Sequence, residues 1–109
     1  MIREVDFLIT PMEPGESRNL RVYAESPISV AIRCFVSNPP PPGYRACAEC
    51  GNFTISSGET LEVSASRRAF AQGGQLEIVI VDAEGDQRSF LLSVESEARG
   101  ESGGMMAAY

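Results

Sequence analysis

The chain has 109 residues, of which 43% are hydrophobic and 22% charged, so it suits one folded domain and is too short for two. Fifteen acidic residues against nine arginines give a formal net charge of -6, a poor match for the phosphate backbone of nucleic acids. Histidine is absent, and with it the commonest general base and metal ligand, so we expect no enzyme.

The segment at 4–10 alternates between apolar and polar side chains, which is typical of a half-buried strand. We expect Val5, Phe7 and Ile9 to face the core, followed by a loop at 11–15 with two prolines and a glycine. Acidic residues interrupt the first apolar run, and no run approaches the length of a membrane span. We therefore expect no secretory signal, no transmembrane segment and cytoplasmic synthesis.

Two further strands are predicted on either side of Ser26-Pro27, because this pair interrupts the alternation between them. The period of two assigns one apolar face to each strand. The residues expected to face inward are Leu20, Val22 and Ala24 in the first strand, and Ile28, Val30, Ile32, Cys34 and Val36 in the second.

The connection at 38–51 is long and contains four consecutive prolines, which favour polyproline geometry. Connections of this length in compact domains are usually functional or flexible. Within it, the stretch from Pro41 to Tyr44 fits a pattern that WW-type domains bind. A stiff connector between strands is the alternative interpretation of the same residues.

Cys47 and Cys50 form a C-x-x-C pair within this connection, and Cys34 precedes them on a predicted strand. Two thiolates at this spacing supply half of a zinc site, to which Cys34 would add a third ligand. In a chain made without export, reduced thiols are the expected state, with a disulfide or a metal site as alternatives. We predict no cofactor, and retain the three cysteines as candidate metal ligands.

The second half of the chain indicates four more strands. Phe53 and Ile55 mark a short one, and Leu61, Val63 and Ala65 mark the next. A connector follows at 67–74, with room for one helical turn at its centre. Residues 76–95 then predict a β-hairpin, because two alternating runs flank a Gly-bearing turn.

The hairpin at 76–95 separates its side chains into two sets. We expect the inner set to form one wall of the core, and it comprises Ile78, Ile80, Phe90, Leu92 and Val94. Asp82, Glu84 and Asp86 crowd the turn, where the spacing fails for a calcium loop and favours a solvated acidic turn.

Seven short strands at roughly ten-residue spacing, without an amphipathic helix, predict an all-β antiparallel sandwich. On strand count, spacing and alternation, residues 2–96 resemble an immunoglobulin-like domain, although the core tryptophan and the inter-sheet cysteine pair of antibody domains are missing. We assign residues 1–97 to the seven-stranded sandwich. Residues 98–109, rich in Gly and Ser, are expected to form an extended C-terminal arm.

Two groups of apolar residues have no expected place in the core. One lies on the outer side of the predicted strands and the other lies in the arm. The candidate partner-binding residues are Val79, Val81, Leu91 and Phe35 on the sheet, and Met105, Met106 and Tyr109 in the arm.

These features predict a non-enzymatic structural subunit that binds a protein partner, or repeated copies of itself, in a larger assembly. We expect no nucleic acid, membrane or small-molecule substrate. Small immunoglobulin-like accessory modules of bacteriophage virions are similar, which implies a role in capsid decoration or in a phage tail. The alternatives are a ligand-binding or adhesion module that uses the Pro-rich loop 38–51, and a metal-dependent domain that uses the three cysteines.

Overall fold

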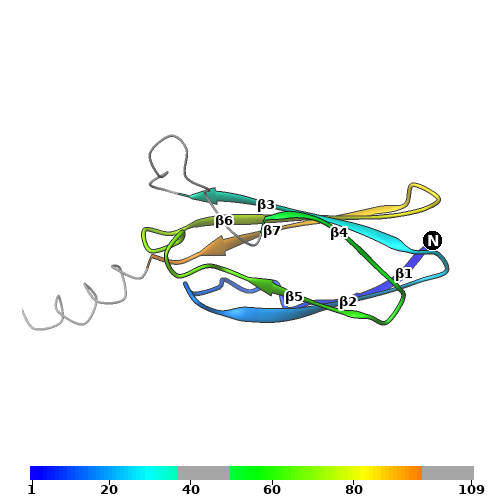
Figure 1. Cartoon of the computed structure of the whole chain (residues 1–109), viewed down its shortest axis with the longest axis horizontal. Coiled ribbons are helices and arrows are strands. Elements are labelled where there is room, and N and C mark those ends of the chain that lie inside the picture. The colour runs from blue at the N-terminus through cyan, green and yellow to red at the C-terminus, as the bar shows by residue number, and fades with distance from the viewer. Residues whose placement is uncertain (37–49, 97–109) are drawn as a thin grey trace, which may run out of the picture.

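The computed structural model describes residues 1–36 and 50–96, which form two facing β-sheets (Figure 1). The described residues contain seven strands and no helix, so the predicted all-β class is confirmed. The described residues contain no helix of the length and hydrophobicity needed to cross a membrane. The strands are β1 (Ile2–Asp6), β2 (Ser17–Ala24), β3 (Ile28–Val36), β4 (Gly51–Ile55), β5 (Thr60–Ser64), β6 (Gly74–Asp82) and β7 (Gln87–Val94).

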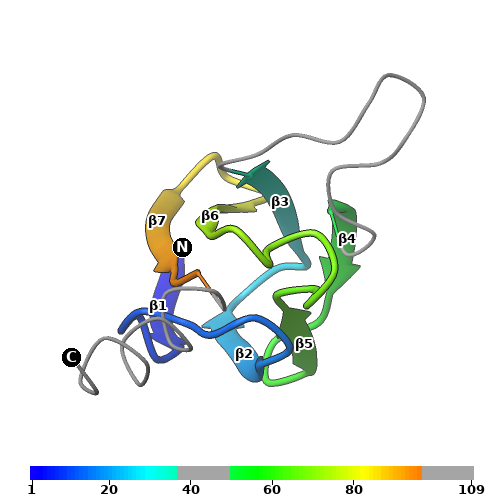
Figure 2. The ribbon, with the colours of Figure 1, turned by 90° about the vertical axis from the view of Figure 1, so that its left-hand side faces the viewer.

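The strands divide into a three-stranded sheet with the order β1-β2-β5 and a four-stranded sheet with the order β4-β3-β6-β7. All neighbouring strands within each sheet are antiparallel. The end-on view shows the two sheets as separate layers that face each other (Figure 2). The arrangement is therefore sandwich-like, with one shared core between the layers.

The core is filled by the inward side chains that the period of two predicts for β2, β3 and β6. Leu20 and Val22 from one sheet are fully buried, as are Ile28, Ile78 and Ile80 from the other. The hairpin at 76–95 is also confirmed, since β6 and β7 pair along their length from Gly74 with Val94 to Val81 with Gln87. Alternation thus located most of the core without any long-range information.

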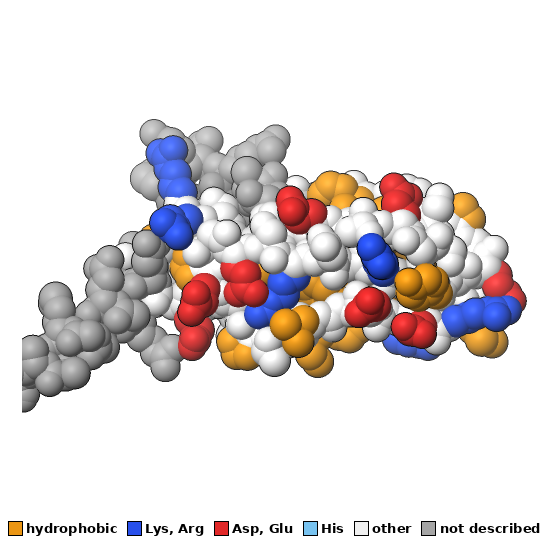
Figure 3. Space-filling model, turned by 90° about the horizontal axis from the view of Figure 1, so that it is seen from below, with side chains coloured by type: hydrophobic (Ala, Val, Ile, Leu, Met, Phe, Trp, Pro, Cys, Tyr) orange, Lys and Arg blue, Asp and Glu red, His pale blue; other side chains and the backbone are white. Residues whose placement is uncertain are grey.

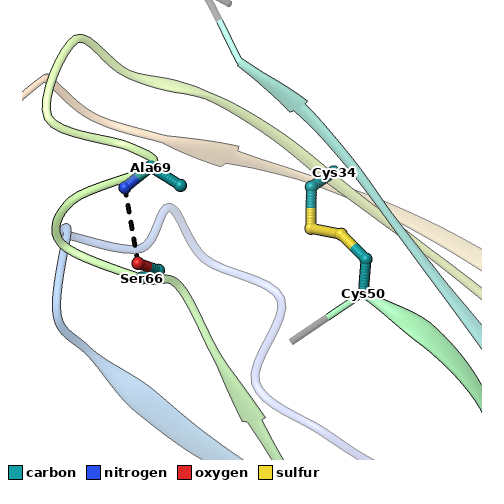
Figure 4. Close-up of a disulfide and its surroundings, with 4 residues drawn as sticks. All are labelled: Cys34, Cys50, Ser66 and Ala69. Carbon is teal, nitrogen blue, oxygen red and sulfur yellow. Dashed lines mark hydrogen bonds between the residues drawn. A yellow bond between two sulfur atoms is a disulfide. The ribbon is translucent and has the colours of Figure 1, made fainter. Parts of the chain in front are cut away.

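Two large core side chains come from segments that the sequence assigned to loops. Met12 and Phe70 are both completely buried. The connector before β6 turns at Ser66, whose carbonyl accepts a hydrogen bond from Phe70 N at 2.9 Å. The Ser66 Oγ also accepts a hydrogen bond from Ala69 N at 3.3 Å (Figure 4). This single helical turn directs the Phe70 ring into the core.

The first strand differs from the prediction of a strand over 4–10. It begins at Ile2, which is buried, and ends at Asp6, while Ile9 is 56% exposed instead of facing the core. The register shifts between Ile2 and Glu4, and the chain then leaves the three-stranded sheet. Met12 instead forms a parallel bridge to Val94 at the edge of the four-stranded sheet, so the N-terminal segment contacts both layers.

The turn between β6 and β7 is acidic, as predicted, but Asp82 is not solvated: the residue is only 5% exposed. Its Oδ1 accepts hydrogen bonds from the backbone N–H groups of Glu84 at 3.0 Å and Asp86 at 2.8 Å. Aspartate often closes turns in this way, because its short side chain reaches the backbone a few residues ahead. The carboxylate at 82 is therefore a structural part of the hairpin.

Candidate functional site

The outward side of the four-stranded sheet brings together the four sheet residues predicted to bind a partner. β3 and β6 are its two central strands, and their side chains lie in rows across the sheet. The outward pairs are Ser29 with Val81, Ala31 with Val79, Arg33 with Glu77, and Phe35 with Gln75. The flanking strands add Asn52 and Thr54 from β4, and Gln87, Ser89, Leu91 and Ser93 from β7. We call these fourteen outward residues the neutral face.

The apolar side chains of the neutral face differ in their exposure. Phe35 is 50% exposed and Leu91 is 60% exposed, whereas Val79 and Val81 are half-buried by their neighbours on the sheet. Phe35 and Leu91 therefore offer the largest apolar groups on this side. Large exposed side chains surrounded by partly covered ones are common where a protein surface binds another protein.

The charge of the neutral face is unusual for this acidic chain. Among its described residues the only charged side chains are Arg33 and Glu77, which face each other across β3 and β6 with Nη1 3.9 Å from Oε1. The remaining side chains are aliphatic, aromatic, hydroxyl or amide groups. The face therefore has no net charge, although the whole chain carries -6.

The outer side of the three-stranded sheet is different. Figure 3 looks onto this side of the molecule and shows acidic and basic side chains interspersed with separate hydrophobic groups. Asp6, Arg21 and Thr60 lie side by side in one row of the sheet, and Arg21 Nε donates to Thr60 Oγ1 at 2.7 Å. Glu62 is exposed in the next row. Such a surface suits contact with water.

A shallow hollow of about 370 Å³ lies at one end of the neutral face, lined by Phe35, Val36, Gly74, Gln75 and Ser93. It lies where Gly74 of β6 pairs with Val36 of β3. A Cβ atom at Gly74 would lie 2.1 Å from the Phe35 carbonyl oxygen, so only glycine fits there. The hollow is open and lacks the enclosure of a small-molecule site, so we treat it as part of the neutral face.

Cys34 and Cys50 form a disulfide between the end of β3 and the start of β4, which differs from the expectation of reduced thiols (Figure 4). Their Cα atoms are 6.2 Å apart, within the normal range for such a bond. Neither sulfur is then a free thiolate for a metal ion, and no group of three metal-ligating side chains occurs among the described residues. The bond joins the two ends of the Pro-rich connection, whose residues 37–49, Cys47 included, lie outside the described chain.

Arg18 organises the segment that crosses from one sheet to the other, and sequence analysis gave it no role. Its side chain is only 9% exposed, and its Nε donates to Glu16 Oε2 at 2.7 Å. Its Nη1 and Nη2 atoms donate to three backbone carbonyls at 2.5 to 2.8 Å, those of Leu8, Thr10 and Pro11. The guanidinium also lowers the pKa of the Glu16 carboxyl by its hydrogen bond.

The same segment presents two adjacent aliphatic side chains to solvent. Leu8 is 59% exposed and Ile9 is 56% exposed. Phe7 precedes them with its ring 6.5 Å from that of Phe90, and Met12 follows them at the bridge to β7. Because the Arg18 contacts fix the backbone between these anchors, Leu8 and Ile9 form a second small apolar surface. A strand pattern that predicted Ile9 to be buried could not reveal it.

The amino group of Met1 lies beside the acidic turn of the β6–β7 hairpin. It is 2.6 Å from Asp82 Oδ2 and also contacts the carboxylate of Glu84. These contacts, chiefly that with Asp82, raise the pKa of the amino group to about 10 and lower the pKa of the Asp82 carboxyl. These contacts join the first residue of the chain to the turn of the β6–β7 hairpin.

The predicted contact residues of the arm, Met105, Met106 and Tyr109, lie outside the described residues. Of the predicted partner-binding residues, the described chain therefore contains only those of the neutral face. Comparison with protein-family models, with curated proteins and with solved structures gave no match for this chain.

Proposed function

We propose that this protein is a non-enzymatic structural subunit that docks on a larger assembly through the neutral face. The observation that carries the proposal is the contrast in charge. Charged side chains are numerous among the described residues, yet only one ion pair lies on the outward side of the larger sheet, beside Phe35 and Leu91. Depletion of charge around exposed large apolar groups is typical of the central part of protein interfaces.

The proposed architecture is immunoglobulin-like, and the strand order supports it. In immunoglobulin domains the first, second and fifth strands share one sheet, and the third, sixth and seventh share the other. The same sets occur here, but β4 lies beside β3 on the larger sheet, whereas the fourth strand of constant-type immunoglobulin domains belongs to the other sheet. This architecture hosts many unrelated functions, so the docking role rests on the neutral face and not on the strand order.

The assembly that we propose is a virion, in which the protein decorates a capsid or belongs to a tail. The Cys34–Cys50 disulfide supports a working environment outside a reducing cytoplasm, such as a virion surface. The C-terminal residues 98–109 would act as a strap that adds to the contact made by the neutral face. Two weak contacts in one subunit bind more tightly than either alone, because the second forms at high effective concentration.

The experiment that tests this function is co-sedimentation of tagged protein with particles purified from the source. We expect the wild-type protein in the fast fractions, and on a regular lattice by electron microscopy. Leu91→Arg should stay at the top of the gradient, because it replaces one of the two largest exposed apolar groups of the neutral face by a charge. Glu62→Arg, on the opposite sheet, is the matched control and should sediment like the wild type. Wild-type protein that never leaves the position of the free chain contradicts the proposal.

The second candidate function is a ligand-binding or adhesion module that uses the Pro-rich loop 38–51. The observation that favours it is the Cys34–Cys50 disulfide. This bond holds the loop at both ends, because it links β3, which precedes the loop, to the start of β4, which follows it. Deletion of residues 39–44 distinguishes the two functions. It should abolish binding if the loop is the recognition element, and leave co-sedimentation intact if the neutral face is.

A further inference from the structure

We infer that the partner of the neutral face is a second copy of this chain, packed face to face about a two-fold axis. The inference rests on the proposed function, since it names the partner of the same surface. It is carried by two properties of the face, the register of β3 against β6 and the position of the Arg33–Glu77 pair, while the size of the surface sets the expected strength of the contact.

The register makes the face complementary to itself. β3 and β6 are adjacent, and each outward residue of one lies beside an outward residue of the other. A two-fold axis that runs between these strands, parallel to them, places every β3 side chain over the β6 side chain from the same row. Ala31 then meets Val79 of the second copy. Ser29 similarly meets Val81, so small groups oppose larger ones along half of the contact.

The same axis places Arg33 over Glu77 of the second copy, and Glu77 over its Arg33. Within one chain these two side chains are 3.9 Å apart and Arg33 is largely exposed, so the guanidinium has donors available for a second carboxylate. A dimer therefore contains four alternating charges at its centre. The other charged side chains of the described residues lie off the neutral face, where repulsion between copies is smaller.

The size of the face predicts a weak dimer. From Ser29 to Phe35 the sheet extends about 20 Å along the strands, and four strands span about 19 Å across them. The face thus covers about 400 Å² per copy, or about 800 Å² for two copies, below the roughly 1,200 to 2,000 Å² of stable interfaces and in the range of weak, transient ones. We expect a dimer that forms with rising concentration and that multiple contacts stabilise in a larger assembly.

The test uses two opposite charge reversals and their mixture, measured by sedimentation equilibrium on the full chain. The wild type should rise from 11.7 kDa toward twice that mass as concentration increases from micromolar to millimolar. Arg33→Glu and Glu77→Arg should each weaken self-association at least about 100-fold, because the axis brings two pairs of like charges together. An equimolar mixture should form the heterodimer, since every contact across the axis is then between opposite charges.

The controls separate folding from association. Both variants should keep the circular dichroism spectrum and melting temperature of the wild type within a few degrees, because Arg33 is exposed, Glu77 is only half-buried and the two charges are 3.9 Å apart. Glu62→Arg on the other sheet should dimerise like the wild type. A mixture that stays monomeric, or an Arg33→Glu variant that dimerises as strongly as the wild type, overturns the inference.

The outcome also separates this inference from the proposed function. A chain that stays monomeric at all concentrations, but sediments with particles in a manner that Leu91→Arg abolishes, retains the docking function and loses the second copy as its partner. A chain whose variants recombine as described, but that never sediments with particles, supports the inference and overturns the docking function.

Discussion

The two outer faces of this fold both belong to antiparallel sheets but expose different chemistry to solvent. On the three-stranded sheet, Asp6, Arg21 and Glu62 lie among polar neighbours. On the neutral face, charge is confined to Arg33 and Glu77. In both sheets the outward side chains alternate along the strands with side chains of the same buried core, so packing of the core does not impose the difference. It indicates that the sequence keeps one face suited to water and the other suited to protein contact.

The largest expected effect tests how closely the central strands of the neutral face must pack. Gly74→Ala should destabilise the fold by about 4 kcal/mol, because the new Cβ would lie 2.1 Å from the Phe35 carbonyl oxygen and the backbone must move. Chemical denaturation measures the change. Gly85→Ala is the matched control: no atom lies within 4 Å of its Cβ, but its φ of 89° disfavours alanine. It should lose only about 1 kcal/mol. Equal losses would contradict the steric explanation.

The disulfide should rank next, because it constrains the edge of the same sheet. Replacing Cys34 and Cys50 together by serine should cost about 3 kcal/mol, as expected for a bond that closes a loop of this length. The measurement is the free energy of unfolding of the variant and the wild type without reductant. Cys47→Ser is the control and should leave stability unchanged. A wild-type protein that gains no stability over the double variant would show that the bond does not form in solution.

Arg18 differs from the other charged residues named on the three-stranded sheet, because its side chain is buried while those of Asp6, Arg21 and Glu62 are exposed. Arg18→Met should cost about 2 kcal/mol, because it leaves three backbone carbonyls and Glu16 without their donors. The exposed Arg21→Met variant should change stability by less than about 0.5 kcal/mol. Hydrogen exchange should also rise along 8–16 in the Arg18 variant alone. Protection that is equal in both variants would mean that Arg18 does not hold this segment.

The contrast between the two arginines also shows where sequence reasoning succeeds and fails. Alternation is a local property, so it correctly placed Leu20, Val30 and Ile78 in the core and Leu91 outside it. It failed at Ile2 and Ile9, which are equally apolar. Ile2 is buried and Ile9 is exposed because the chain leaves the three-stranded sheet between them. After it leaves, the backbone carbonyls of Leu8 and Thr10 accept hydrogen bonds from Arg18, and a local pattern cannot predict these contacts.

The candidate site was predictable only in part for the same reason. Val79, Val81, Leu91 and Phe35 follow from strand period alone, but their neighbours in each row depend on the register between strands. The pairing of Arg33 with Glu77 across β3 and β6 therefore could not be predicted from the sequence alone. Asp82 was missed because its burial depends on the turn backbone and on the amino group of Met1, which is 81 residues away in the sequence.

The smallest expected effect concerns this amino group. Its pKa in the folded chain is raised to about 10 from an ordinary value of 8, so its contribution to stability is complete below pH 8 and is lost as the pH rises through about 10. The melting temperature should therefore fall over this interval. Asp82→Asn preserves an oxygen for the turn but removes the charge, so this variant should show a weaker dependence on pH over the same range. An identical slope in the two proteins would mean that the ion pair does not contribute to stability, and that the turn contacts of Asp82 suffice to hold the hairpin.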